Sequence, residues 1–155
     1  MVNYTRQDYP LSTEGRNSME FNFNLEGGNF SRAGAASSEV KKVLKQLNVD
    51  AALIKRIVVA LYEAEVNVVA HAWEGIMKVV FDGKAIIVTI SDKGPGIPDI
   101  DQAMQEGFST ASPEVREMGF GAGMGLPNMK KNCDRLQIES TVNVGTTVTM
   151  VTYLQ

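Results

Sequence analysis

The chain of 155 residues contains one cysteine and one histidine. A lone cysteine, Cys133, excludes an internal disulfide framework and fits a reducing compartment. A structural zinc site needs several Cys or His ligands, so this class of metal site is not expected either.

Long apolar runs and an excess of positive charge are also absent. The longest aliphatic run, IVVAL at 57–61, is far too short to span a membrane. The first twenty residues lack the apolar core of a signal peptide. The formal net charge is −3 and the pI is near 5.2, which gives no electrostatic footprint for nucleic acid or an anionic membrane. We therefore expect a cytoplasmic protein with no nucleic-acid or membrane partner.

The composition is that of an ordinary soluble domain, with 44% hydrophobic and 21% charged residues. This length favours a single domain with its own core. Residues 1–18 are polar and rich in turn formers, which indicates a flexible N-terminal arm. The domain itself is expected at 19–155, with no internal repeat and no linker.

The hydrophobic pattern predicts alternating strands and helices. Residues 19–26, MEFNFNLE, alternate like a half-buried strand. An amphipathic helix is expected over 31–47, and a more buried helix over 51–73 with Asp50 as its N-cap. Asp82-Gly83 is a strong hairpin signal between strands at 76–81 and 85–90.

The C-terminal half continues this pattern. The remaining expected elements are a short helix at 99–105, a helix at 126–134, and strands at 136–142 and 146–153. Strands before and after the helices, mostly in hairpins, predict an α+β two-layer sandwich. Its sheet should be mixed, mainly antiparallel, with the helices on one face.

Polar residues on the buried helix form a stripe. Glu63, Asn67 and His71 recur every four residues, so they lie on one side of the helix. Burying such groups costs on the order of 2–7 kcal/mol unless they are paired or face a solvated cleft. The stripe is therefore either a polar seam bonded to backbone or water, or the wall of a binding site.

The segment SDKGPGIPDI, residues 91–100, follows the apolar strand AIIVTI. Asp92 can accept a hydrogen bond from an exocyclic amine. Gly94 and Gly96 remove side chains from the following backbone, which allows a ligand to approach closely. The same pattern also suits a structural turn with no ligand.

Glycines precede the helix that begins near Leu126. These glycines are Gly119, Gly121, Gly123 and Gly125. They lead into a helix N-terminus, where free N–H groups and the helix dipole favour phosphate binding. Ser109, Thr110 and Ser112 add hydroxyl donors ahead of them. A flexible connection without a ligand explains the glycines equally well. Gly145-Thr146-Thr147 taken alone is a turn into a β-branched strand.

The four features in this order resemble one family, the GHKL nucleotide-binding domains of the Bergerat fold. Gyrase, MutL, heat-shock chaperones and sensor histidine kinases share that fold. The resemblance covers residues 19–153 and rests on EAEVNVVAHAW, DKGPGIPDI, GFGAGMGLPNMKKNCDRL and GTTVTM. NVVAHA, GFST and GLPNMKKNCDRLQIES are most similar to the small bacterial anti-sigma factors and switch serine kinases.

The resemblance implies roles in binding ATP and Mg²⁺. Glu63 would be the catalytic base, and Asn67 would bind Mg²⁺ through its amide oxygen. His71 would lie at the phosphate end of the stripe or support the site from behind. Asp92 would hold the adenine amino group with Thr147 beside it. The further nucleotide-binding residues would be Gly94, Gly96, Ile97, Ser109, Thr110, Gly121, Gly123, Met124, Gly125 and Leu126.

The resemblance also implies a function. Members of the subfamily are serine/threonine-protein kinases that phosphorylate a small STAS-type antagonist and regulate a partner, such as a sigma factor, by binding it. The alternative is a nucleotide-gated binding module without useful kinase activity, although the intact Glu63 favours the kinase. A histidine-kinase half would need a phosphoacceptor histidine on a dimerising helix pair, and a gyrase-type ATPase would need further domains. Related proteins are often dimers, so a homodimer is possible.

Overall fold

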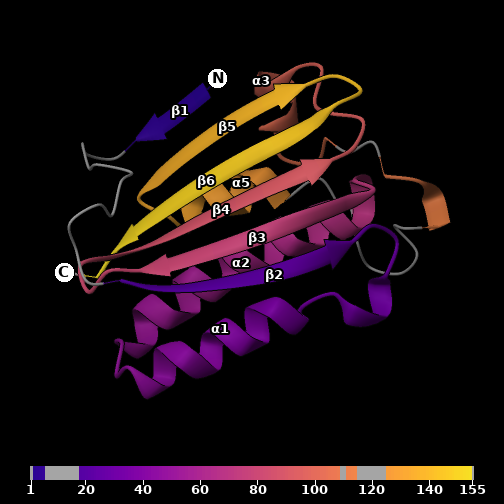
Figure 1. The fold of residues 1–155 in the computed structure, drawn as a ribbon. Coiled ribbons are helices and arrows are strands. Elements are labelled where there is room, and N and C mark those ends of the chain that lie inside the picture. The colour runs from indigo at the N-terminus through magenta and orange to yellow at the C-terminus, as the bar shows by residue number, and fades with distance from the viewer. Residues whose placement is uncertain (1, 6–17, 109–110, 115–124, 155) are drawn as a thin grey trace.

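The computed structural model describes residues 2–5, 18–108, 111–114 and 125–154. These residues form two layers, a six-stranded sheet and a set of helices packed on one of its faces (Figure 1). The strands are β1 (Val2–Thr5), β2 (Met19–Glu26), β3 (Glu74–Phe81), β4 (Ala85–Lys93), β5 (Arg135–Thr141) and β6 (Gly145–Tyr153). The helices are the 3-10 turn η1 (Phe30–Arg32), α1 (Ala35–Gln46), α2 (Ala51–His71), α3 (Ile100–Ala103) and α5 (Gly125–Lys131).

The strand order is β1-β5-β6-β4-β3-β2. The expected α+β sandwich with helices on one face is confirmed. The sheet is more uniform than the mixed one expected, because every described pair of neighbouring strands is antiparallel. The helical hairpin of α1 and α2 explains the β2–β3 pairing. It returns the chain to the end of β2, where the Gly27 N–H donates to the Trp73 carbonyl across 2.9 Å.

Strand β1 departs from the expected N-terminal arm. Val2 pairs with Ile138 and Thr5 with Arg135, so residues 2–5 extend the sheet beyond β5. Without them, β5 would be an edge strand with unpaired backbone groups. Residues 6–17 of the expected arm lie outside the described residues.

The predicted element boundaries shift by a few residues where local geometry decides. Asp50 caps α2 as expected, accepting the N–H groups of Ala52 and Leu53. Helix α1 begins at Ala35 because Gly34 takes a left-handed conformation, with φ of 94°. Strand β4 continues to Lys93, so Asp92 belongs to the strand rather than to the loop after it.

The core lies between the sheet and the helices. Side chains alternate along the strands, so Met77, Val88 and Val148 face the helices while their chain neighbours face the other side. Leu61 of α2 and Met129 of α5 are fully buried against this layer. None of the helices among the described residues has the length and apolar character needed to cross a membrane.

A buried carboxylate joins the two long helices. The start of α1 has no side-chain cap of its own. Glu65 of α2, only 1% exposed, accepts the N–H groups of Gly34, Ala36 and Ser37 and the hydroxyl of Ser37 at 2.7–3.2 Å. These four hydrogen bonds fix the start of α1 on α2.

Candidate functional site

Helix α2 carries the polar stripe between two other parts of the structure. Near one end of the stripe, Oε2 of Glu63 lies 3.7 Å from the position that a Cβ on Gly125 would occupy. At the other end, Ala72 packs against Gly94, whose added Cβ would lie 3.0 Å from the Ala72 Cα. The stripe therefore runs from the start of α5 to the loop after β4. Within the described residues, Glu63 rather than His71 adjoins the helix that follows the glycine-rich segment.

The two interpretations of the stripe can be compared at Asn67. This side chain is half-buried, and no described residue hydrogen-bonds to its amide. A polar seam tied to the surrounding protein would have satisfied that amide. Among the described residues, no donor occupies the neutral amide oxygen, so it is open to a ligand or to solvent on their side.

His71 ends α2 and is also half-buried. Burial lowers the pKa of its imidazole, because the charged form loses hydration there. The imidazole is therefore mainly neutral at neutral pH.

Asp92 stands on the helix side of β4, next to the start of β6. Its Oδ1 accepts the backbone N–H of Thr146 across 3.0 Å. Burial raises the pKa of this carboxyl, and the hydrogen bond from Thr146 partly opposes that effect. No described residue donates to the second carboxylate oxygen. That oxygen can accept a hydrogen bond from a ligand's amino group.

The loop after Asp92 is tied down rather than loosely connected. Gly96 has φ of 75°, and an added Cβ there would lie 2.5 Å from the Thr141 carbonyl oxygen. The Ile97 N–H donates to Ser140 Oγ across 2.8 Å, and Ser140 Oγ is also 2.8 Å from Thr146 Oγ1. One hydroxyl thus links the loop to β5 and β6. The backbone of the loop is held beside Asp92, as a binding loop requires.

Thr147 does not lie where it was expected. Its hydroxyl lies on the face of the sheet away from the helices, 3.2 Å from Ser91 Oγ. Because strand side chains alternate, the preceding residue faces the site instead. Thr146 is buried and contacts Asp92 directly. The buried apolar residues Val148 and Met150 could have shown this, since they share a face with Thr146.

Helix α5 begins at Gly125 as the glycine pattern predicted. The Leu126 side chain is 6% exposed and belongs to the core, so this residue can face a ligand only through its backbone. Asn128, which the sequence did not single out, donates its amide N–H to Glu63 Oε1 across 3.1 Å. Several predicted site residues lie outside the described residues, namely Ser109, Thr110, Gly119, Gly121, Gly123 and Met124.

The described donor set fits an ATP–Mg²⁺ ligand better than a protein-bound metal. No group of three or more His, Cys, Asp or Glu side chains within the described ranges could hold a metal ion. A cation at Asn67 would need most of its oxygen ligands from elsewhere, and phosphate oxygens with water supply them for Mg²⁺. Asp92 offers an acceptor, whereas Gly94 is buried against Ala72 and Gly96 packs against Thr141.

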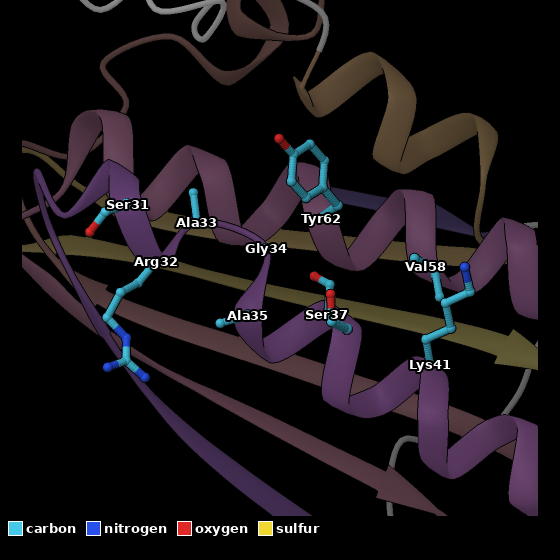
Figure 2. A pocket seen from close by; sticks show the side chains of 10 residues that line it. Ser31, Arg32, Ala33, Gly34, Ala35, Ser37, Lys41, Val58 and Tyr62 are labelled. Atoms are coloured by element: carbon cyan, nitrogen blue, oxygen red, sulfur yellow. The ribbon is translucent and has the colours of Figure 1, made fainter.

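A separate hollow of about 480 Å³ lies on the other side of α2 (Figure 2). Residues of η1 and the start of α1 form one wall, and Val58 and Tyr62 of α2 form the other. None of Glu63, Asn67 and Asp92 lines it. It is therefore distinct from the site built around the stripe.

Comparisons with known proteins show the family of the chain. A family model described as the histidine kinase-like ATPase domain matches residues 29–152. An anti-sigma F factor of Thermoanaerobacter sp. (strain X514) is 36% identical over 143 residues, covering 89% of this chain and 94% of the relative. The serine/threonine-protein kinase RsbT of Bacillus subtilis (strain 168) is 32% identical over 125 residues, covering 78% of this chain and 88% of that kinase.

A solved structure shares the fold. A crystal structure of the RsbU and RsbW domains of a Mycobacterium tuberculosis protein aligns with a TM-score of 0.59 and 17% identity. The alignment covers 88% of this chain and 32% of that one. The family model, the two relatives and the shared fold lead to one assignment. The chain belongs to the histidine kinase-like (GHKL) ATPase family, in its branch of anti-sigma factors and switch serine kinases.

Proposed function

We propose that this protein is an ATP-dependent serine/threonine-protein kinase of the anti-sigma factor type. It would phosphorylate a serine of a small STAS-type antagonist and regulate a second partner, such as a sigma factor, by binding it. The observation that carries the proposal is the position of Glu63. Its carboxylate adjoins the start of α5. It lies one helical turn from Asn67, whose amide has no hydrogen-bond partner among the described residues, and on the helix that reaches the Asp92 loop.

The described side chains have separate tasks in this proposal. Asp92 accepts a hydrogen bond from the adenine amino group and so selects the base. The Asn67 amide oxygen holds Mg²⁺, which neutralises charge on the phosphate oxygens when it is bound. Glu63 accepts the proton of the attacking serine hydroxyl. Phosphoryl transfer depends mainly on positioning and charge neutralisation. A site in which Glu63 acts as the general base suits this chemistry.

The names of the relatives support the two halves of the proposal separately. RsbT is named as a serine/threonine-protein kinase, which supports transfer to a hydroxyl. The Thermoanaerobacter relative is named as an anti-sigma F factor, which supports a sigma factor as the bound partner. A protein that only binds nucleotide does not need Glu63 as a base, and this favours the kinase.

The first experiment measures ATP and ADP binding by calorimetry, with and without Mg²⁺. Binding that strengthens with Mg²⁺ is expected, and no binding of either nucleotide would contradict the proposal. Transfer is then followed from γ-labelled ATP to a panel of recombinant STAS-domain proteins. Glu63→Gln should keep ATP binding and lose transfer by on the order of 10²–10⁴-fold.

Glu39→Gln is the matched control, because Glu39 is an exposed residue of α1 remote from the stripe. It should leave both nucleotide binding and transfer unchanged. The competing function is a nucleotide-gated binding module. Wild-type protein that binds ATP and a partner, yet transfers no phosphate to any STAS domain, would favour that module.

A further inference from the structure

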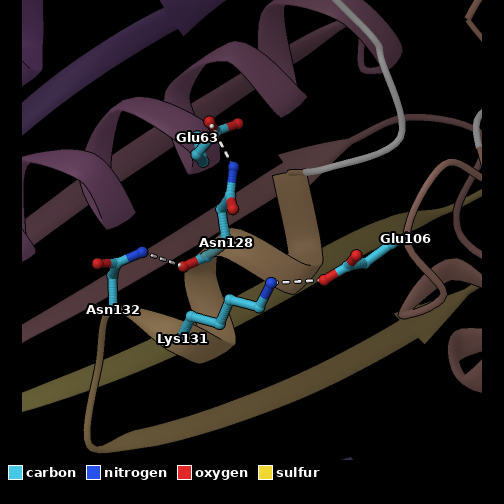
Figure 3. Close-up of polar contacts among 5 residues, drawn as sticks. All are labelled: Glu63, Glu106, Asn128, Lys131 and Asn132. Atoms are coloured by element: carbon cyan, nitrogen blue, oxygen red, sulfur yellow. Dashed lines mark hydrogen bonds and ion pairs between the residues drawn. The ribbon is translucent and has the colours of Figure 1, made fainter.

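Helix α5 places the amide of Asn128 against the Glu63 carboxylate. The Asn128 N–H donates to Glu63 Oε1 across 3.1 Å (Figure 3). Both side chains are half-buried, so water screens this contact less than it would at the surface. The two residues are 65 positions apart in the chain, and only the packing of α5 on α2 brings them together.

The position of the Asn128 amide is itself fixed. Leu126, Pro127 and Met129 are buried around it, which sets the rotation of the short helix. The Asn132 amide donates to the Asn128 carbonyl across 2.8 Å. Lys131 forms an ion pair with Glu106, beyond the end of α3 (Figure 3). The amide therefore meets Glu63 from a helix that is held mainly by its buried side chains, since the Asn132 bond is local and the Lys131–Glu106 pair is exposed.

This contact makes the two oxygens of Glu63 different. Oε1 accepts the amide hydrogen bond, while Oε2 faces Gly125, where no side chain intervenes. An amide does not titrate in the physiological range, so Asn128 can orient the carboxylate without taking its proton. No described charged residue hydrogen-bonds or pairs with Glu63.

We infer that Asn128 is a positioning residue that holds Oε1 of Glu63, so that Oε2 is the oxygen that receives the serine proton. This inference rests on the proposed role of Glu63 as the base. A general base works only when its accepting atom lies within hydrogen-bond reach of the proton. A fixed carboxylate also avoids an entropic cost during the reaction, since its orientation is already set.

The competing explanation is that the contact only joins two helices. Buried apolar side chains already hold α5 on the core, so loss of the amide should leave the fold intact. The two roles differ in what they do to the acid–base behaviour of Glu63. The test therefore follows that behaviour directly.

Asn128→Asp replaces the donor with a second carboxylate at nearly the same place. Two carboxylates at this distance cannot both ionise easily, so the pKa of Glu63 should rise. The base is then protonated at pH values where wild type is active. The acidic limb of the pH–rate profile should move up by about one unit or more, with activity recovering at higher pH.

Asn132→Asp is the matched control. It makes the same chemical change four residues further on, directly after the end of α5, but Asn132 contacts the Asn128 carbonyl and not Glu63. It should lower stability without moving the acidic limb. Asn128→Leu removes the donor and adds no charge. It should reduce kcat about 10-fold or more, with the KM for ATP changed less than about 2-fold.

A second readout does not depend on kinase activity. The Glu63 side-chain carboxyl is titrated by ¹³C NMR, with its signal assigned from Glu63→Gln. A raised Glu63 pKa in Asn128→Asp but not in Asn132→Asp, with a matching shift in the pH–rate profile, supports the inference. If the wild type is active and Asn128→Asp changes neither the Glu63 pKa nor the pH–rate profile, the inference is overturned. A wild type that transfers no phosphate overturns the proposed kinase instead, and the NMR titration then decides separately whether Asn128 holds Glu63.

Discussion

Thr146 donates its backbone N–H to Asp92 Oδ1 across 3.0 Å, so the start of strand β6 supports the carboxylate near the end of β4. One carboxylate oxygen is thereby engaged and the other remains free of described donors. In the proposed function, this arrangement would fix the direction from which an adenine amino group is bound. It also gives a precise expectation for an isosteric change.

Asp92→Asn should reduce ATP affinity by about 100-fold, as measured by calorimetry. The Asn oxygen can still accept the Thr146 N–H, and the new NH₂ group then faces the adenine NH₂ group, donor against donor. Inosine triphosphate carries an acceptor at that position, so the variant should bind inosine triphosphate about as tightly as the wild type does. Asp99→Asn, in the cap of α3, is the control. Equal losses for both nucleotides would contradict a direct contact with the base.

Gly96→Ala should weaken ATP binding, whereas Gly83→Ala should not. Both glycines have positive φ, of 75° and 87°, so both variants share a backbone strain of about 1 kcal/mol. An added Cβ would meet the Thr141 carbonyl at Gly96 and nothing within 4 Å at Gly83. The loop at Gly96 must therefore move away from β5. Calorimetry with ATP and urea unfolding of both variants check this, and equal ATP affinities would count against the loop as part of the site.

Glu65→Gln should lower the free energy of unfolding by about 3 kcal/mol. The hydrogen bonds to a buried charge are lost, and the new amide NH₂ of the glutamine faces the backbone N–H groups at the start of α1. The carboxylate accepts three backbone N–H groups and one hydroxyl at the start of α1. Urea unfolding without nucleotide measures the change. Glu39→Gln on the exposed side of α1 should change it by less than about 0.5 kcal/mol. Similar values for both variants would show that the buried cap contributes little.

His71 should make stability fall under mildly acidic conditions. Burial lowers the pKa of His71 in the folded protein below its value of 6.5, so the unfolded chain binds the proton more readily. Stability is then full above about pH 6.5 and is lost as the pH falls through that value toward the lowered pKa. Thermal unfolding from pH 8 to pH 5.5 should show the loss, and His71→Gln should flatten it. As the single histidine of the chain, His71 can also be titrated by ¹H NMR, where an unshifted pKa would refute this expectation.

Local sequence determined most of the elements. Asp50 capped α2 and Asp82-Gly83 closed the β3–β4 hairpin, because both signals act within a few residues. The four-residue spacing of Glu63, Asn67 and His71 set one side of α2, since helical geometry alone decides which residues share a face. The motifs around them were enough to indicate the family.

Tertiary structure decided which residues contact one another in the candidate site. Thr146 rather than Thr147 meets Asp92, because a strand turns successive side chains to opposite faces and only the assembled sheet shows which face holds the site. Asn128 meets Glu63, and Glu65 caps α1, across separations that no local pattern records. The sequence by itself determined the elements and the kinds of chemical group, because those depend on short-range periodicity. The pairing of those groups was decided only when α5, α1 and β6 packed around α2 and β4, because contacts between distant segments exist only in the packed structure.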